Sequence, residues 1–65
     1  MALTTAEKLL LRGLKVFQLR RGNIMLVMML MDTEEKRYNL MTFMTNSPNA
    51  TEAEIIEEAY KIAKI

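Results

Sequence analysis

Eight apolar residues follow one another without a break at Ile24–Met31, in a chain of only 65 residues. The run shows neither the spacing of an amphipathic helix nor the alternation of a strand with one wet face. Its length matches a strand that is covered on both faces, and it is too short to cross a bilayer as a helix. We therefore predict a central β-strand at Ile24–Met31 and no association with a membrane.

Strands are predicted on either side of this run. Arg37–Thr45 alternates between two sets of side chains, and the polar segment Asp32–Lys36 before it is typical of a hairpin connection. Leu14–Arg20 holds a β-branched and an aromatic residue and precedes the loop-like Arg21–Asn23, which favours a strand there as well. The middle of the chain is thus predicted to form three strands.

Two helices are predicted at the ends of the chain. Thr4–Glu7 and Thr51–Glu54 both match the capping box, in which a threonine and a glutamate three residues later satisfy backbone N–H groups at a helix start. The second helix is predicted to run from Thr51 almost to the C-terminus. The first is predicted to end at Gly13, because glycine suits the left-handed position after a helix. In an alternative, it continues through Gly13 and covers Thr5–Arg21.

The predicted fold is a single small α+β domain that covers residues 1–65. Its order is α-β-β-β-α, with an antiparallel three-stranded meander because the connections between the strands are short. Both helices are expected to pack on one face of the sheet, and one helix on each face is the alternative arrangement. With the long first helix Thr5–Arg21, the order becomes α-β-β-α.

The chain contains no cysteine and no histidine, and 51% of its residues are hydrophobic. Disulfides and zinc sites built from the usual ligands are excluded, and the common bases and nucleophiles of neutral pH are missing. The acidic segment Asp32–Glu35 lacks the glycine and the ligand spacing of a calcium loop. We expect no enzymatic activity, no metal and no cofactor, and small domains of this kind often gain stability from a partner.

If both helices cover one face of the predicted sheet, its other face is apolar and typical of an interaction surface. Six residues at alternating positions of the two later strands are assigned to this interface: Met25, Val27, Met29, Met31, Met41 and Phe43. The hypothesis is a methionine-rich, non-catalytic protein-interaction or regulatory module in the cytoplasm. It would form a homodimer and bind an unidentified protein, as small phage or bacterial regulators do.

The charge distribution suggests an alternative function. Residues 1–23 hold five basic residues and one acidic residue, a formal charge of +4 in a chain whose total is +1. The basic residues are Lys8, Arg12, Lys15, Arg20 and Arg21, and such side chains can contact nucleic-acid phosphates. A solvated helix face and loop explain them more simply, so nucleic-acid binding is the less favoured hypothesis.

Overall fold

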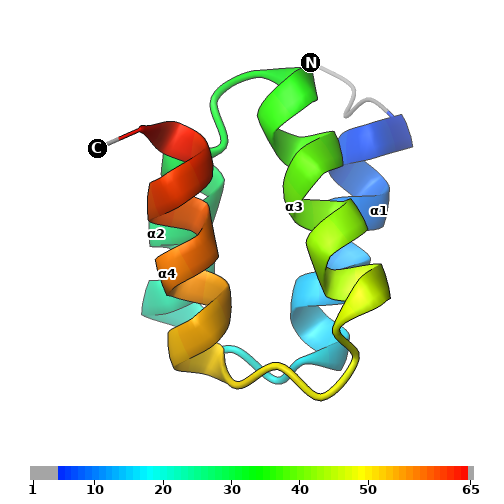
Figure 1. Ribbon diagram of the computed structural model, residues 1–65, viewed down its shortest axis with the longest axis vertical. Helices are drawn as coiled ribbons and strands as arrows, with labels where there is room; N and C mark the ends of the chain where they lie inside the picture. The colour runs from blue at the N-terminus through cyan, green and yellow to red at the C-terminus, as the bar shows by residue number, and fades with distance from the viewer. Residues whose placement is uncertain (1–4, 65) are drawn as a thin grey trace.

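The computed structural model describes residues 5–64, apart from the side chains of Ala6 and Glu7. This part of the chain contains no strand and forms four helices: α1 (Thr5–Val16), α2 (Arg21–Leu30), α3 (Glu34–Asn46) and α4 (Glu52–Ala63) (Figure 1). The predicted α+β fold with a three-stranded meander is therefore wrong, and so is its α-β-β-α alternative. Both terminal helices are present, and the segments assigned to strands lie largely in helices as well.

The helices pack as two pairs. α1 and α3 share the most extensive contact and run in the same direction, while α2 and α4 pack together and run in the opposite direction (Figure 1). Contacts between α3 and α4 join the two pairs. Among helices that follow each other in the described sequence, only α3 and α4 pack extensively, so the bundle is held mainly by helices that are not consecutive.

The apolar run Ile24–Met31 lies in α2 and in the residue that ends it. Val27 and Met31, four residues apart, are buried, whereas Met25 and Met29 lie on the other side of the helix and are 61% and 74% exposed. The helix therefore has an inner and an outer side, although its sequence is apolar on both. Methionine and leucine are good helix formers, and a short apolar run does not by itself distinguish a strand from a helix.

A Schellman motif ends α1. Gln18 has a left-handed backbone (φ 55°), and its N–H donates to the Lys15 carbonyl at 3.0 Å. The Leu19 N–H donates to the Leu14 carbonyl at 3.4 Å, and both leucines are buried. These two bonds and the paired apolar residues define the motif, whose left-handed position usually carries glycine. The chain turns here toward α2, so the alternative first helix Thr5–Arg21 is too long.

Gly13 lies inside α1 and serves packing rather than helix termination. A Cβ atom placed there would lie 3.1 Å from Cε of Met44 on α3, closer than most Cβ contacts in proteins. The predicted helix end at Gly13 is wrong, since α1 continues to Val16. The missing side chain at Gly13 instead allows α3 to approach α1. The close approach fits the extensive contact between these two helices.

A cap begins α3 where a hairpin was predicted. The Thr33 hydroxyl accepts a hydrogen bond from the Lys36 backbone N–H at 3.2 Å, and Lys36 Nζ pairs with Asp32 Oδ1 at 2.9 Å. Glu34 and Glu35 add negative charge to the first turn, which favours a helix start. The polar segment Asp32–Lys36 is therefore a connection followed by the first turn of a helix.

The alternation predicted for Arg37–Thr45 is also wrong. The buried residues of α3 are Leu40 and Met44, which have helical spacing. The hydroxyls of Thr42 and Thr45 donate to carbonyls four residues earlier, at 3.0 and 2.9 Å. Threonine favours strands, but these bonds satisfy both hydroxyls on the backbone of α3 itself.

The prediction for α4 is confirmed. The Thr51 hydroxyl accepts the Glu54 backbone N–H at 3.2 Å, and the Glu54 carboxylate accepts the Thr51 N–H at 3.3 Å, which completes the capping box. Ile55 and Ala59 are the buried residues of this helix. The corresponding box predicted at Thr4–Glu7 begins outside the described residues.

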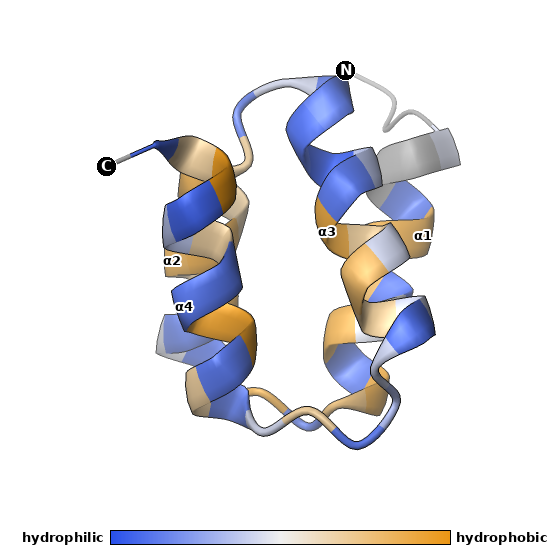
Figure 2. Ribbon diagram, viewed as in Figure 1, coloured by the Kyte–Doolittle hydropathy of each residue, from blue (hydrophilic) through white to orange (hydrophobic). Residues whose placement is uncertain are grey.

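The core lies between the four helices and receives side chains from each of them and from the α1–α2 and α2–α3 connections. Its buried residues are Leu10, Leu14, Leu19, Val27, Met31, Leu40, Met44, Ile55 and Ala59. Figure 2 shows apolar segments on every helix, interrupted by polar ones. None of the helices in residues 5–64 has both the length and the apolar composition needed to cross a bilayer.

Candidate functional site

A groove of about 430 Å³ lies between α1 and α3 and is the candidate site. We call it the α1–α3 groove. Its lining residues are Leu9, Arg12, Gly13, Val16, Phe17, Met41, Met44, Thr45 and Pro48. Seven of these nine residues carry no polar side chain, so the groove offers a largely apolar surface with two polar positions.

Helical spacing brings the lining residues together. Leu9, Arg12 and Val16 follow at intervals of three and four on α1, so they lie along one side of that helix. Met41 and Thr45 are one turn apart on α3 and face the groove from the other wall. The two helices run in the same direction (Figure 1), and both contribute lining residues to the groove.

Gly13 on α1 faces Met44 on α3, since a Cβ atom placed at Gly13 would lie 3.1 Å from Cε of Met44. Met44 is nearly fully buried and also lines the groove, so its side chain belongs both to the core and to the groove. Gly13 also lines the groove, and it adds no side chain to the crowded region around Met44. The groove therefore depends on the residue that the sequence pattern assigned to a helix end.

Two large apolar side chains beside the groove are in contact with water. Leu9 is 41% exposed and Val16 is 74% exposed, and neither contributes to the buried core. Single exposed apolar residues are ordinary on protein surfaces, whereas apolar residues gathered around a concave surface are typical of a binding site. The groove, with Leu9 and Val16 in its lining, forms such a gathering.

The charge along the groove has one sign. Arg12 lines it, and Lys8 and Lys15 lie one turn before and one turn after Arg12 on the same helix. All three side chains are exposed. Among the described lining residues none is acidic. The α1 edge of the groove is therefore positively charged.

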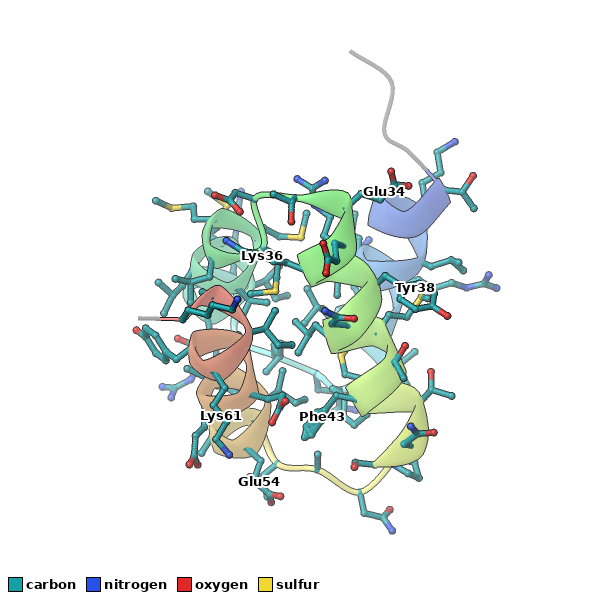
Figure 3. All side chains as sticks on the ribbon, turned by 45° about the horizontal axis from the view of Figure 1, so that its top comes forward. Glu34, Lys36, Tyr38, Phe43, Glu54 and Lys61 are labelled. Carbon is teal, nitrogen blue, oxygen red and sulfur yellow. The ribbon has the colours of Figure 1, made fainter. Side chains whose placement is uncertain are left out.

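A second, smaller hollow of about 140 Å³ lies between α3 and α4. It is lined by Phe43, Glu54, Glu57, Glu58 and Lys61. Figure 3 shows Phe43 on α3 directed toward the start of α4, where Glu54 lies, with Lys61 further along that helix. Within residues 5–64 no group of histidine, cysteine, aspartate and glutamate side chains is arranged to hold a metal ion.

The six residues predicted to form one interface lie in four different environments, because the alternation of a strand does not apply to a helix. Val27 and Met31 are in the core, whereas Met25 and Met29 are on the outer side of α2. Of the remaining two, Met41 lines the α1–α3 groove, and Phe43 lines the smaller hollow. No shared sheet face unites them in the described part of the chain.

Most residues of the α1–α3 groove were not identified from the sequence. Leu9 and Val16 are seven residues apart, or two helical turns, and Gly13 lies between them. This spacing is a signal of an apolar row beside the core row of Leu10 and Leu14. It was missed because the residues after Gly13 were assigned to a strand.

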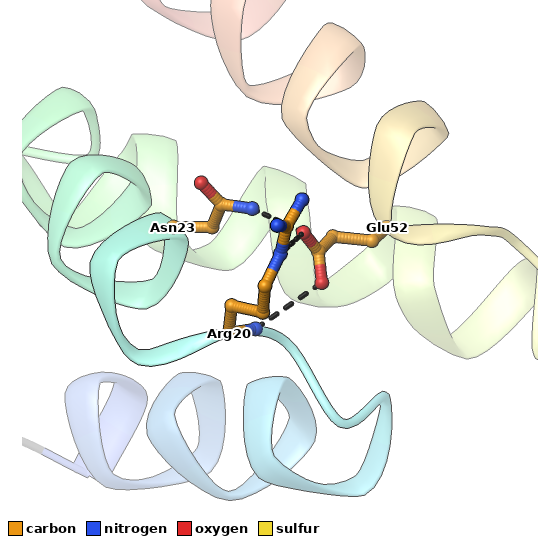
Figure 4. A network of polar contacts seen from close by, with 3 residues as sticks. All are labelled: Arg20, Asn23 and Glu52. Carbon is orange, nitrogen blue, oxygen red and sulfur yellow. Dashed lines mark hydrogen bonds and ion pairs between the residues drawn. The ribbon is translucent and has the colours of Figure 1, made fainter.

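The five basic residues lie on two elements. Lys8, Arg12 and Lys15 are on α1, and Arg20 and Arg21 are at the start of α2. Arg20 is held by Glu52 of α4, through its Nε to Oε1 at 3.3 Å and its backbone N–H to Oε2 at 3.1 Å (Figure 4).

Asn23 Nδ2 donates to the same Glu52 carboxylate, so the network joins the first turn of α2 to the first residue of α4 (Figure 4). The backbone N–H of Arg20 is the main reason that the pKa of Glu52 is lowered, and the side chains of Asn23 and Arg20 add to this effect. The Arg20 side chain remains 84% exposed, so this ion pair is a surface contact of small individual strength.

The chain has no significant match among protein-family models, curated proteins or solved structures.

Proposed function

We propose that this chain is a small, non-catalytic protein-binding module whose α1–α3 groove receives the apolar side chains of a partner. The observation that supports it is the groove itself, an apolar concave surface with Leu9 and Val16 exposed beside it. Covering apolar surface contributes about 25 cal/mol per Å² removed from water, so these side chains are available to stabilise a complex.

The shape of the groove favours a helical segment as the bound element. Two parallel helices form its walls, and amphipathic helices commonly bind in such grooves through apolar residues repeated at helical spacing. The flexible thioethers of Met41 and Met44 suit this role, because methionine adapts to the shape of an incoming side chain.

The proposed binding surface replaces the predicted sheet face. The protein-interaction hypothesis does not require a sheet, since the groove supplies an apolar surface from different residues. Only Met41 of the six predicted interface residues belongs to it. A homodimer remains a prediction, and sedimentation of the full chain at micromolar concentration measures it directly.

The test is to select helical peptides from a randomised displayed library against the full chain and to map where they bind. Val16→Glu changes the groove, and Met29→Glu is its matched control, since both side chains are 74% exposed and lie outside the core. Circular dichroism confirms that both variants fold. We expect selected peptides to lose binding to Val16→Glu and to keep it for Met29→Glu.

Two results would contradict the proposal. Peptides whose binding is unchanged by Val16→Glu would show that the groove is not the binding surface. A failure to select any peptide, with a positive control target yielding binders in the same experiment, would show that the groove has no capacity for a helical partner.

A further inference from the structure

We infer that the partner of the α1–α3 groove is an amphipathic helix whose apolar stripe is flanked by acidic side chains. This inference rests on the proposed function and adds the chemistry of the partner. It follows from the combination of an apolar lining with a basic edge, because a partner must satisfy both.

The basic edge consists of Lys8, Arg12 and Lys15, which lie in a row along α1. Arg12 is the member of the row that lines the groove, so its guanidinium lies beside whatever occupies the apolar surface. A helix with basic flanks would place like charges against this row, whereas acidic flanks would form ion pairs at the rim. Pairs at a rim contribute mainly to specificity and to the rate of association.

The distribution of charge over the whole molecule also favours an acidic partner beside α1. Residues 5–30 carry five basic side chains and one acidic one, a formal charge of +4, and residues 32–64 carry four basic and seven acidic ones, a formal charge of −3. An acidic partner is therefore attracted toward α1 and repelled from α4. Such an asymmetric field steers charged partners during diffusion.

A second copy of this chain fits the groove less well. Its exposed acidic residues Glu54 and Glu57 are on α4, but the apolar residues Ile55 and Ala59 of the same helix are buried in its own core. Beside its acidic charge, that helix offers Tyr60, 39% exposed, as its one large exposed apolar side chain. Docking it would leave the groove side chains uncovered.

Nucleic acid also fits less well. A phosphate backbone would contact the basic row and leave the exposed side chain of Val16 without an apolar partner. Arg20, at the start of α2, already pairs with Glu52. Its side chain is still 84% exposed, so the uncovered apolar side chain of Val16 is the main reason that nucleic acid fits less well.

The test uses three synthetic helical peptides that share one leucine stripe at i, i+3, i+4 and i+7 and carry glutamate, glutamine or lysine at the flanking positions. Fluorescence anisotropy measures the affinity of each peptide for the full chain at low and high salt. Exposed ion pairs contribute little individually, so the basic row together predicts an affinity about tenfold higher for the glutamate peptide than for the lysine peptide. High salt should reduce this difference.

Arg12→Glu should abolish most of the preference for the glutamate peptide. Arg21→Glu is the matched control, because it makes the same change in net charge at an exposed residue of α2 that does not line the groove. Retention of the preference in Arg21→Glu, with its loss in Arg12→Glu, supports the inference. Loss in both variants would assign the preference to net charge alone and overturn it.

The remaining outcomes separate this inference from the proposed function. Groove binding of all three peptides with equal affinity, or tightest binding of the lysine peptide, overturns the inference and leaves the proposed function standing. Absence of groove binding by any peptide overturns both. If the chain forms a dimer that Val16→Glu dissociates, the occupant is a second copy. If the chain binds a nucleic-acid duplex, and Arg12→Glu loses this binding while Val16→Glu keeps it, the partner is nucleic acid. Either result overturns the inference.

Discussion

The carboxylate of Glu52 caps a helix to which it does not belong. It accepts the backbone N–H of Arg20, the residue that precedes α2, from a position 32 residues further along the chain. The Arg20 side chain makes no capping hydrogen bond of its own. Glu52 therefore supplies both an acceptor and a negative charge at the start of α2, where the helix dipole favours them.

The first prediction concerns this carboxylate and pH. Because the pKa of Glu52 is lowered in the folded protein, its ionised form contributes stability above the usual pKa of glutamate. That contribution is lost as the pH falls through the lowered pKa. We expect Glu52→Gln to lower Tm at neutral pH and the difference from wild type to shrink in acid, measured by circular dichroism across pH.

Glu57→Gln is the control for Glu52→Gln, since it removes a carboxylate from an exposed position of the same helix. The pKa of Asp32 is also lowered, mainly by its hydrogen bond to Lys36, so acid weakens more than one interaction in the wild-type protein. The difference between the two variants isolates the contribution of Glu52. Equal Tm values for both variants at every pH would contradict a capping role for Glu52.

The second prediction separates a helix from a strand at the apolar run. Met25 and Met31 would lie on the same face of a strand, but on α2 Met25 is largely exposed and Met31 is buried. Met31→Ala should lower the free energy of unfolding by about 2 to 5 kcal/mol, and Met25→Ala by less than about 0.5 kcal/mol. Urea denaturation measures both, and similar losses for the two variants would count against the helix.

The third prediction concerns the left-handed residue at the end of α1. Gln18 has φ 55°, a conformation that costs a residue with a Cβ about 1 to 2 kcal/mol relative to glycine. Gln18→Gly should therefore raise the free energy of unfolding by about 1 kcal/mol, after the added flexibility of the unfolded chain is considered. Gln18→Ala keeps the strain and should give no such gain; equal effects of the two changes would exclude this explanation.

The fourth prediction links stability to the groove. Alanine is a better helix former than glycine by about 1 kcal/mol, and the Met44 methyl group that a Cβ at Gly13 would contact is at the end of a flexible side chain. Gly13→Ala should therefore raise the free energy of unfolding by about 0.5 kcal/mol, with Met44 displaced toward the groove.

The displaced side chain in Gly13→Ala should weaken binding of the groove-selected peptides severalfold. Urea denaturation and fluorescence anisotropy on the same variant measure the two effects. A loss of stability instead of a gain would show that Met44 has no room to move. Unchanged peptide affinity would show that the part of the groove at Gly13 and Met44 is not used in binding.

The start of α4 was the part of the fold that the sequence predicted best. The capping box at Thr51 and the apolar spacing of Ile55 and Ala59 depend only on neighbouring residues, and α4 forms as predicted. The run Ile24–Met31 could not be assigned in this way, because its inner and outer sides have the same hydropathy and only packing against other helices distinguishes them.

The candidate site was harder to predict than the helices, for the same reason. Arg12, Lys8 and Lys15 were identified as a basic group, and the structure places them on one helix. The apolar part of the groove depends on the approach of α3 to Gly13, which joins residues far apart in the sequence. The pairing of Arg20 with Glu52 is equally remote, so no local pattern around Arg20 indicates it.

The pairing of α1 with α3 also sets an order of events during synthesis. The whole of α2 and both of its connections separate these two helices, so α1 has no main packing partner while the ribosome is still making α2. Native packing around α1 can begin only after Glu34–Asn46 has left the exit tunnel, and it requires closure of a long stretch of chain. A nascent chain that stops before α3 therefore exposes apolar residues that the finished protein buries.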